Sequence, residues 1–519
     1  MPNRQNNRLK TVSLVILIVL AGRVLGLGRD MLLGQTFGTG WEADALSVAS
    51  NLPRIFFDAI FSSAVAASFI PVFTETAERE GRASADRLAG SFFTVVGLVS
   101  ATLTVLGMVF APRLVDLMAP LFDEQTTALA ARLLTIIFPS LFFTGLAFSM
   151  VGVLQSLGEF NIPAAMSIAS NGILIVYFLF FARRFGVYGA AVALTIGWAA
   201  QAVMQLPSLW KRGFRYRPGL RHPGLKKIFK LMLPVMVSTW IAPINMLIIF
   251  WFASGLPGGV ASLNYANGLF LMVAGIFVLS VTNVIFPEMS RLSAEGDRRA
   301  FCDMVRETTR TLLFLLIPMT VGLMLLATPV VRLLYEYRQF DADSTALTAS
   351  ALAFMSLGMA GYGIQNVLIR AFYAEKRGKI PLLAGLVGVA ANILFCMLFA
   401  GRMGVAGLSL ASAASLLVTA LVLVPAAHKM LGGGLVTRGL ALALGKMICA
   451  ALVMGAAVWW LQGHLAGIFF GDSIWMRLGL VAAPAAVGLT LYLGLAAVMR
   501  LDEINVLRGY LRKHRREGA

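Results

Sequence analysis

The sequence predicts an all-α polytopic membrane protein with about 14 transmembrane helices, arranged as two six-helix lobes related by a parallel internal repeat plus two C-terminal helices. Three observations predict this class. Of 519 residues, 58% are hydrophobic and 13% are charged, whereas a soluble chain carries charge on roughly a quarter of its residues. The apolar residues gather in runs long enough to cross a bilayer. Finally, the second half of the chain repeats a pattern of the first.

The apolar runs define the expected spans. A helix needs about 20 mostly apolar residues, because the hydrocarbon core is about 30 Å thick and each residue rises about 1.5 Å. The first run has a basic start like that of a signal peptide, but it continues past Arg23 without a clear small-x-small cleavage site, so we expect it to be retained. The runs lie at 11–36, 42–75, 89–111, 127–156, 162–182, 187–209, 228–253, 258–288, 307–330, 345–373, 380–400, 405–427, 437–462 and 474–499.

The basic residues predict the orientation of these spans. The formal net charge is +18. If the N-terminus is cytoplasmic, most cations fall in cytoplasmic connections and tails, and the densest group lies between residues 211 and 230. Because cytoplasmic loops carry an excess of Lys and Arg, we expect both termini inside. The cations are dispersed over separate loops, which excludes a nucleic-acid surface. The outward connections hold only Arg113, Arg183, Arg184, Arg332, Arg338 and Arg402.

An internal repeat predicts the two lobes. Residues 162–207 align without a gap on residues 380–425, at an offset of 218 and with 12 identities that include Ile-Pro at the start and Pro at the end. The offset covers six spans, an even number, so the lobes share one orientation. In such parallel-repeat transporters the substrate path lies between the lobes, and rocking gives alternating access. We expect lobes at 1–215 and 216–430, and at 431–519 the last two spans with a basic cytoplasmic tail.

Span 1 carries charge where lipid is expected. A charged side chain costs at least ~2.5 kcal/mol near the helix centre, so it usually faces a cavity or a partner. Arg23 and Arg29 lie about 120° apart around the helix, so they share a side only loosely. Both are candidates to line a polar cavity. Alternatively, Arg29 and Asp30 mark the outer end of the span and pair locally.

Span 2 adds further charges. Asp44 stands near its outer start, and we expect it to be the counter-ion of the span 1 arginines. Arg54 and Asp58 are i, i+4 neighbours, which form either a structural pair or part of a binding site. An arginine-lined cavity suits an anionic head group, because guanidinium groups bind phosphate bidentately and stay protonated. A cation exporter would need unpaired acids, but the acids here lie close to arginines.

The second lobe is less charged. Asn264, Asn267 and Asn283 either line the same cavity or bond between helices. Arg370 is a further candidate for the site, although it is close enough to the inside surface to snorkel. The isolated polar residues for which we expect a structural role are Asn392 and Lys446.

Several chemical motifs are absent. No nucleotide-binding Gly-x4-Gly-Lys-Ser/Thr loop occurs, so we expect no ATP hydrolysis. Asp341-x-Asp343 is similar to a metal-binding pair, but it lies in a short outward connection, where we expect it only to solvate the loop. We therefore expect no cofactor and no metal. Energy would come from the membrane potential or a coupled cation.

Short motifs recur along the chain, most densely in the first two spans. They are Arg23 to Asp30, Phe37-Gly38-Thr39-Gly40, Ala43-Asp44-Ala45, Asn51-Leu52-Pro53, Ser68 to Phe73, Tyr265-Ala266-Asn267, Phe286-Pro287, Arg370 to Ala374 and Ile380-Pro381. These motifs resemble those of the MurJ/MviN lipid II flippases, and the resemblance covers essentially the whole chain. It implies the fold of the multidrug/oligosaccharidyl-lipid/polysaccharide exporter superfamily, in which two six-helix lobes enclose a cavity and spans 13 and 14 form a groove for the lipid tail.

The resemblance also assigns residues. Arg23, Arg29 and Asp44 match positions that the family uses in its cationic cavity. Two departures occur: many members place a basic pair shortly after Asn-Leu-Pro, where this chain has Arg54-Ile55-Phe56-Phe57-Asp58, and many place Arg after Tyr-Ala-Asn/Asp, where this chain has Gly268. The cavity would then hold fewer arginines, and Arg54 is the residue available to replace a missing charge.

The expected function is a flippase that moves lipid II, or a similar anionic polyprenyl-pyrophosphate lipid, from the inner to the outer leaflet of the bacterial inner membrane for cell wall synthesis. We expect a monomer surrounded by membrane lipids, with no enzymatic activity and no nucleic-acid partner. The alternatives are an exporter of another lipid-linked oligosaccharide or a drug, a polytopic glycosyltransferase or ligase, and a non-transporting scaffold. The outward segments are too short for the catalytic loop that a glycosyltransferase needs.

Overall fold

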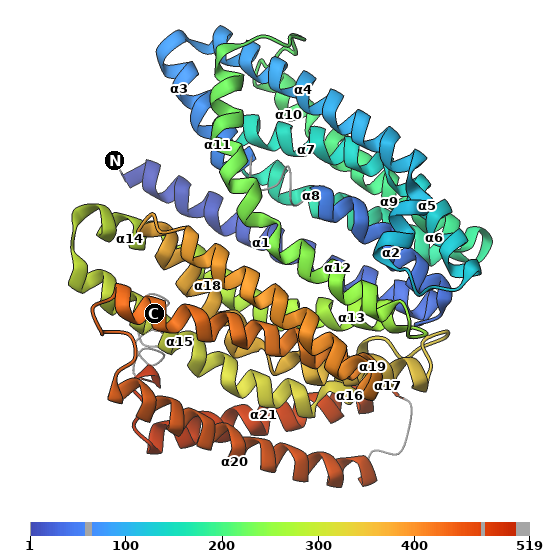
Figure 1. Cartoon of the computed structure of the whole chain (residues 1–519), viewed down its shortest axis with the longest axis vertical. Coiled ribbons are helices and arrows are strands. Elements are labelled where there is room, and N and C mark those ends of the chain that lie inside the picture. The colour runs from blue at the N-terminus through green and yellow to red at the C-terminus, as the bar shows by residue number, and fades with distance from the viewer. Residues whose placement is uncertain (1, 58–64, 469–472, 505–519) are drawn as a thin grey trace. The chain divides into compact units, whose positions relative to one another are not determined.

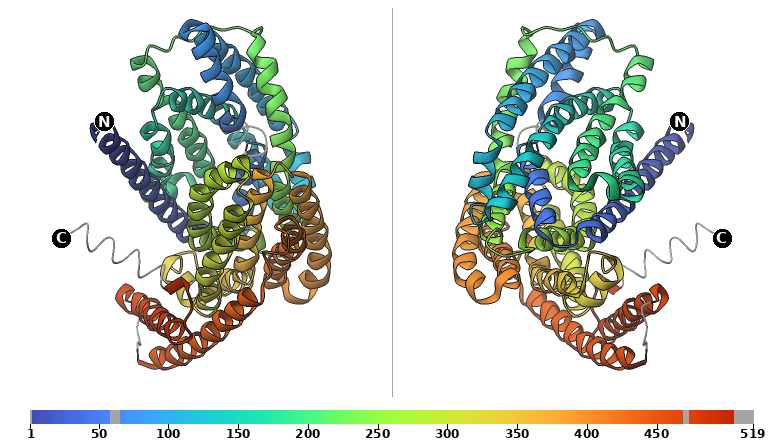
Figure 2. Two further views of the ribbon diagram at one scale, coloured as in Figure 1. Left: turned by 90° about the vertical axis from the view of Figure 1, so that its left-hand side faces the viewer. Right: turned by 90° about the vertical axis from the view of Figure 1, so that its right-hand side faces the viewer.

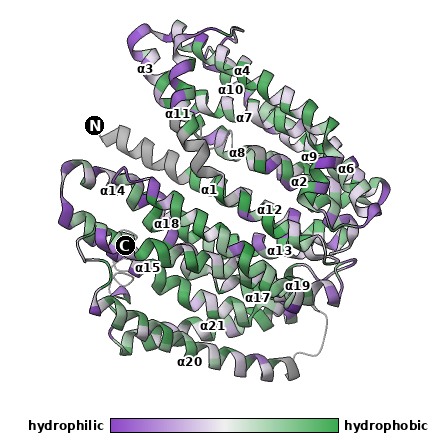
Figure 3. Ribbon diagram, in the orientation of Figure 1, coloured by the Kyte–Doolittle hydropathy of each residue, from purple (hydrophilic) through white to green (hydrophobic). Residues whose placement is uncertain are grey.

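The structure is a computed structural model that describes residues 2–57, 65–468 and 473–504. Every regular element in these ranges is a helix (Figure 1). The all-α prediction is therefore confirmed for the described part of the chain. Hydrophobic residues cover most of α18 (Met359–Ala374) and α20 (Arg438–Ile468) and the C-terminal half of α15 (Arg298–Leu325). Hydrophilic residues gather in connections such as those near α3 (Ile70–Glu80) and α14 (Ile276–Glu295) (Figure 3).

The chain divides into two compact units. Unit 1 comprises Met1–Ala261 and Tyr337–Phe340, and unit 2 comprises Ser262–Glu336 and Asp341–Ala519. These units are defined by contacts within the chain, whereas the lobes at 1–215 and 216–430 are defined by the repeat. The boundaries of the lobes therefore stay a prediction.

The helices of unit 1 pack against one another in defined pairs. Long helix α1 packs on α8, α4 on α7, and α9 on both α7 and α8. The elements are α1 (Pro2–Phe37), α2 (Trp41–Phe57), η2 (Val65–Phe69), α3, α4 (Arg82–Val109), α5 (Ala111–Met118), α6 (Glu124–Ile137), α7 (Pro139–Ser156), α8 (Asn161–Val176), η3 (Tyr177–Phe181), α9 (Ala182–Val203), α10 (Leu206–Lys211), α11 (Pro223–Thr239) and α12 (Ile241–Ala253), where η marks a π-helical turn.

Unit 2 repeats the packing pairs of unit 1. Helix α15 packs on α18 and α18 on α19, in the way that α4 packs on α7 and α7 on α9. Its elements are α13 (Gly259–Phe270), which begins in unit 1, then η4 (Leu271–Gly275), α14, α15, α16 (Ala327–Leu334), α17 (Ala342–Ser356), α18, α19 (Lys379–Met430), α20 and α21 (Ile474–Val498).

Backbone geometry supports the internal repeat. Gly186 has φ 53° and ψ −148° inside α9, and Gly404, 218 positions later, has φ 57° and ψ −131° inside α19. Asp123 caps the N-terminus of α6 by accepting from the Thr126 amide, and Asp341, again 218 positions later, caps α17 by accepting from the Ser344 amide. Both units therefore break and start helices at equivalent positions.

The cap at Asp341 corrects one expectation. This residue was expected only to solvate its loop, but its carboxylate accepts the Ser344 amide at 2.8 Å. Hydrogen bonding to Ser344 stabilises the charged form of Asp341 and lowers the pKa of this carboxyl below its ordinary value. Among the described residues, no group of three or more His, Cys, Asp or Glu side chains is placed to hold a metal ion.

Broken helices affect the count of spans. The described residues contain eight helices long and apolar enough to cross a membrane, or nine if the bent pair of α17 and α18 is one span. Two of the eight, at 161–211 and 379–430, have 51 and 52 residues, about 75 Å each if straight. Both fold back: Gln201 Nε2 donates to Ser170 Oγ at 2.8 Å, and Ser415 Oγ donates to the Gly388 carbonyl at 2.8 Å. Each of these two long helices therefore consists of two segments that pack on each other. The predicted number of 14 transmembrane spans stays a prediction.

The last two helices form a hairpin within unit 2. Helices α20 and α21, dark orange and red, lie side by side in both views of Figure 2 and pack on each other. Buried Tyr492 of α21 donates to the Phe314 carbonyl of α15 at 2.9 Å. At the other end, Arg477 Nη1 donates to the Glu336 carbonyl at 2.6 Å. These bonds tie the hairpin to the rest of the unit.

Candidate functional site

Two glycines set the rotation of α1 against α8. Gly22 and Gly26 are four residues apart and so lie on one face of the helix. A Cβ at Gly22 would collide with Ser167 Oγ, and one at Gly26 would lie 3.4 Å from Asn171 Nδ2. Small residues at this spacing let membrane helices approach closely. The contact fixes which side chains of α1 face α8 and which do not.

Arg29 lies on the α8 side of α1. It is seven residues, almost two full turns, beyond Gly22. Its guanidinium forms an ion pair with Asp30 at 2.6 Å, and its Nη1 donates to Asn171 Oδ1 at 3.1 Å. The local Arg29–Asp30 pair, one of the two alternatives from the sequence, is thus present. About a third of the Arg29 side chain stays exposed, so the guanidinium is oriented without being enclosed.

Asn171 is a functional candidate that the sequence analysis missed. It is buried on α8, and its amide bridges two points of α1: Oδ1 accepts from Arg29, and Nδ2 donates to the Gly22 carbonyl at 3.1 Å. The available signal was a lone amide within an apolar run of the sequence. Its helix partner could not be identified without the α1–α8 contact.

Arg23 differs from Arg29. It follows Gly22 by one residue, or about 100° around the helix, and therefore lies off the α8 face. Its side chain is exposed and forms no ion pair or side-chain hydrogen bond with the residues that the structure describes. Among the described residues, Arg23 is therefore a cation on a membrane helix without an anion to neutralise it.

Asp44 corrects a second expectation. It was expected to be the counter-ion of Arg23 and Arg29, but it forms no ion pair within the described ranges. Its carboxylate is 3% exposed and accepts the Gly258 amide at 2.8 Å and the Ala261 amide at 2.7 Å. Acidic groups are favoured at helix N-termini, where free amides point outward. Asp44 joins α2 to the start of α13 instead.

Arg54 lies near the C-terminal end of α2, after Pro53. Its side chain is exposed, and Nη2 lies 3.7 Å from the Met246 sulfur on α12. Asp58 lies outside the described residues, so the proposed Arg54–Asp58 pair stays a prediction.

The candidates of unit 2 lie on different helices. Asn267 is half-buried on α13, and exposed Gly268 follows it. Arg370 Nη2 of α18 donates to Asn283 Oδ1 of α14 at 2.8 Å. The structure thus joins two of the polar residues that the sequence had singled out separately.

The two isolated polar residues have structural contacts. Lys446 Nζ donates to the Met499 carbonyl at the C-terminal end of α21, at 2.8 Å. Asn392 is 1% exposed, and its Oδ1 lies 3.6 Å from Cys396 Sγ one turn later. Both contacts agree with the structural role expected for them.

In unit 1 the arrangement fits an anionic ligand. Arg29 is held by Asp30 and Asn171, and Arg23 lies nearby on the same helix with its charge uncompensated. Guanidinium groups bind phosphate oxygens through paired N–H donors and keep their charge at all physiological pH values. A phosphate-bearing head group is the ligand class that such guanidinium donors suit.

Comparisons with known proteins identify related chains. A family model described as lipid II flippase MurJ matches residues 33–478. A probable lipid II flippase MurJ of Rhizobium meliloti (strain 1021) is 28% identical over 516 residues, covering 94% of each chain. A lipid II flippase MurJ of Burkholderia cenocepacia is 27% identical over 491 residues, covering 92% of this chain and 95% of the relative.

Solved structures share the fold. A lipid II flippase MurJ in an inward closed conformation has a TM-score of 0.80 at 24% identity, over 95% of this chain and 99% of that one. An inward-facing multidrug resistance MATE family transporter of the MOP superfamily has a TM-score of 0.67 at 15% identity, over 81% and 98%. The transporter fold expected from the sequence is therefore confirmed.

Proposed function

This chain belongs to the MurJ lipid II flippase family, and we propose that it carries lipid II from the inner to the outer leaflet by alternating access. Lipid II is the substrate named for its relatives. The proposal is supported by family membership over most of the chain and by the cationic residues of α1. Flipping requires no bond to be made or broken, so we propose a transporter without catalytic activity.

The observation that carries the proposal is the uncompensated charge of Arg23. An unpaired charge in a membrane helix is costly, and it is usually retained because it binds a substrate or lines a water-filled path. We propose that Arg23 and Arg29 bind the pyrophosphate, with Asn171 and Asp30 orienting Arg29. Arg54, Asn267 and Arg370 are proposed as further contacts for the head group. Asp44 acts indirectly, by joining α2 to α13.

The driving force proposed is the membrane potential. A ligand shifts a conformational equilibrium only through different affinities for the two states, so binding alone gives no direction. Asp30 pairs with Arg29, and Asp44 accepts hydrogen bonds from backbone amides. Neither of these two carboxylates is therefore free to bind a coupled cation. An inside-negative potential, in contrast, favours outward movement of an anionic lipid.

The proposed setting is the bacterial inner membrane, with both termini cytoplasmic and the protein acting as a monomer. The multi-span membrane character agrees with the long apolar helices, and the distribution of Lys and Arg supports the orientation.

The test is complementation of a strain whose own lipid II flippase can be depleted. The wild-type chain should restore growth and outer-leaflet lipid II, measured by accessibility to an external lipid II-modifying enzyme. Arg23→Ala should abolish both at normal protein levels, and Arg183→Ala, at an exposed position in the first turn of α9, is the matched control. Normal growth of the Arg23→Ala strain at normal protein levels would refute the role given to Arg23.

A second candidate is export of another lipid-linked oligosaccharide. It is favoured by Gly268, which is exposed on α13 where the resemblance implies an arginine in many members. A sister exporter would leave inner-leaflet lipid II unchanged in depleted cells, so the same accessibility assay separates the two candidates.

A further inference from the structure

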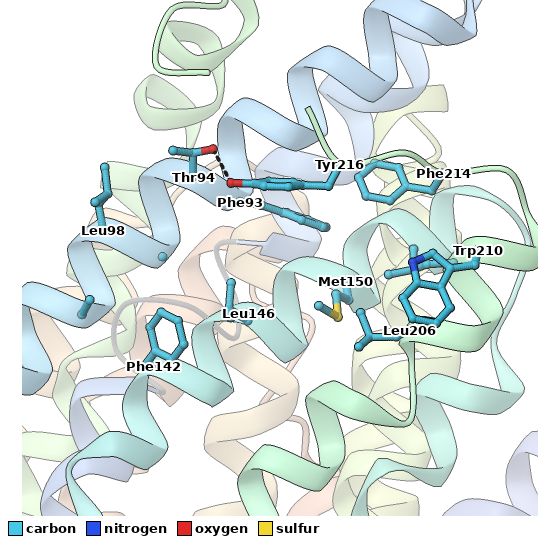
Figure 4. A pocket seen from close by; sticks show the side chains of 13 residues that line it. Phe93, Thr94, Leu98, Phe142, Leu146, Met150, Leu206, Trp210, Phe214 and Tyr216 are labelled. Carbon is cyan, nitrogen blue, oxygen red and sulfur yellow. Dashed lines mark hydrogen bonds between the residues drawn. The ribbon is translucent and has the colours of Figure 1, made fainter. Parts of the chain in front are cut away.

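An apolar pocket lies in unit 1, built from elements other than α1 and α2. It has a volume of about 550 Å³ and is lined by α4, α7, α10 and the segment that follows α10. Figure 4 shows Phe93 and Leu98 of α4, Phe142 of α7, Trp210 of α10 and Tyr216 around it. The volume lies within the range of about 300–1,000 Å³ that is typical of ligand pockets.

The segment after α10 is fixed directly on α4. Gly90 makes this possible, because a Cβ there would collide with the backbone of Arg217. The Phe93 and Phe214 ring centroids are 5.4 Å apart, and Thr94 Oγ1 and Tyr216 Oη are hydrogen-bonded at 2.9 Å (Figure 4). The wall of the pocket is therefore an ordered part of the unit. Because the hydroxyl groups of Thr94 and Tyr216 bond to each other, the rest of the lining is apolar and suits a hydrocarbon chain.

The pocket lies at the depth of lipid chains. Charged residues at the start of α4 end at Arg87, and Phe93 to Ala101 follow at about 9–21 Å along the helix. Leu98 is 55% exposed and Trp210 is 68% exposed. In a membrane-spanning chain, exposed apolar side chains at this depth face lipid. The pocket therefore opens toward one leaflet, on the side that holds the connection between α10 and α11.

Cations border the same pocket. Lys211 follows Trp210, and Arg215 and Arg217 flank Tyr216. All three are exposed, and none forms an ion pair within the described ranges. Arg212 is different, because its Nη2 is paired with Glu159 at 2.6 Å. Basic clusters at the ends of membrane helices bind anionic lipid head groups.

We propose that this pocket binds one acyl chain of an anionic glycerophospholipid, whose phosphate is held by Arg215 and Arg217. The apolar lining accounts for the chain, and the uncompensated cations account for the head group. The site is separate from the proposed pyrophosphate contacts and does not depend on lipid II being the substrate. Its occupant would be a lipid of the surrounding leaflet that stays bound while the unit moves.

The test uses the full-length protein in nanodiscs containing phosphatidylglycerol with a photoreactive group on one acyl chain. After illumination, mass spectrometry of peptides should place crosslinks on residues 93–101 and 206–216. The phosphatidylcholine analogue should label these peptides far less. Equal labelling by both lipids, or labelling spread evenly over all lipid-facing helices, would overturn the proposal. So would loss of the crosslinks on adding a polyprenyl pyrophosphate, because the pocket would then hold that tail.

Two variants make the test specific to the pocket. Gly97→Leu should fill the pocket and abolish the crosslinks. A Cβ at this position would lie 3.8 Å from its nearest neighbour, so the new side chain can enter the pocket without a collision at the backbone. Its control is Gly172→Leu on α8, where the space is open. Arg215→Gln with Arg217→Gln should lower labelling by phosphatidylglycerol about thirtyfold, the effect of removing two cations at a membrane surface. The control pair is Arg183→Gln with Arg184→Gln. Unchanged labelling of both pocket variants would refute the site.

Discussion

Neighbouring charges on the first two helices have different structural fates. Arg29 is held by Asp30 and Asn171, and Arg23 has no ion-pair partner among the described residues. Asp44 accepts hydrogen bonds from backbone amides at the start of α13. The sequence identified each of these residues as unusual because charge is rare in apolar spans. Their roles depend on which groups the fold brings to them.

Asp44→Asn tests the structural role of this carboxylate. The side-chain oxygen of Asn can accept one amide, but its NH₂ would face the other N–H as a second donor. We expect the change to destabilise the protein by about 1–3 kcal/mol, the cost of a buried unsatisfied amide, and to lower the thermal unfolding temperature in detergent. Glu42→Gln, two residues earlier on α2, is the control. Equal stability of the two variants would show that the Asp44 bonds contribute nothing.

The contacts of Asp44 and Arg29 differ in how far they could be predicted from the sequence. The Arg29–Asp30 pair could be proposed from adjacency alone. The partners of Asp44 are 214 and 217 positions away, and the Arg29 partner Asn171 is 142 positions away. No local pattern specifies such contacts, so sequence reasoning pairs Asp44 with the arginines of span 1.

At the scale of the element, the internal repeat aligns Gly186 with Gly404. The alignment alone does not predict that both glycines break a helix. The structure shows that both interrupt a helix with positive φ, a conformation that glycine adopts readily because it has no Cβ. Helix breaks of this kind cannot be predicted from hydropathy, which sees one continuous apolar run.

Gly404→Ala should therefore destabilise the protein through the backbone alone. A Cβ at Gly404 meets no atom within 4 Å, and its φ is +57°, so the expected cost of about 1–3 kcal/mol comes from strain. Gly401→Ala, in the same helix and also with open space around it, is the matched control and should stabilise the helix by up to about 1 kcal/mol, because alanine has the higher helix propensity. Thermal unfolding in detergent measures both. A Gly404→Ala variant as stable as Gly401→Ala would contradict the strain argument.

On the scale of the whole molecule, composition predicts the class and the repeat predicts two similar halves. Equivalent caps, breaks and helix pairs in the two units bear this out. Composition is informative here because the bilayer requires every spanning backbone group to be bonded within the protein, which limits the possible folds. The number of spans is harder to predict, because a bent or broken helix can appear in the hydropathy as one continuous apolar stretch.

The membrane potential gives a final prediction for the whole molecule. If a pyrophosphate lipid carries two negative charges, outward movement through an inside-negative potential of 100 mV releases about 4.6 kcal/mol, at ~2.3 kcal/mol per charge. This free energy depends on the lipid charge and the potential, and is independent of the path through the protein. In proteoliposomes with a potassium diffusion potential, lipid II should therefore accumulate in the leaflet facing the positive side. Collapsing the potential should return the distribution toward equality, and reversing it should reverse the asymmetry. A distribution that ignores the potential but follows an imposed cation gradient would show that a coupled ion drives the movement instead.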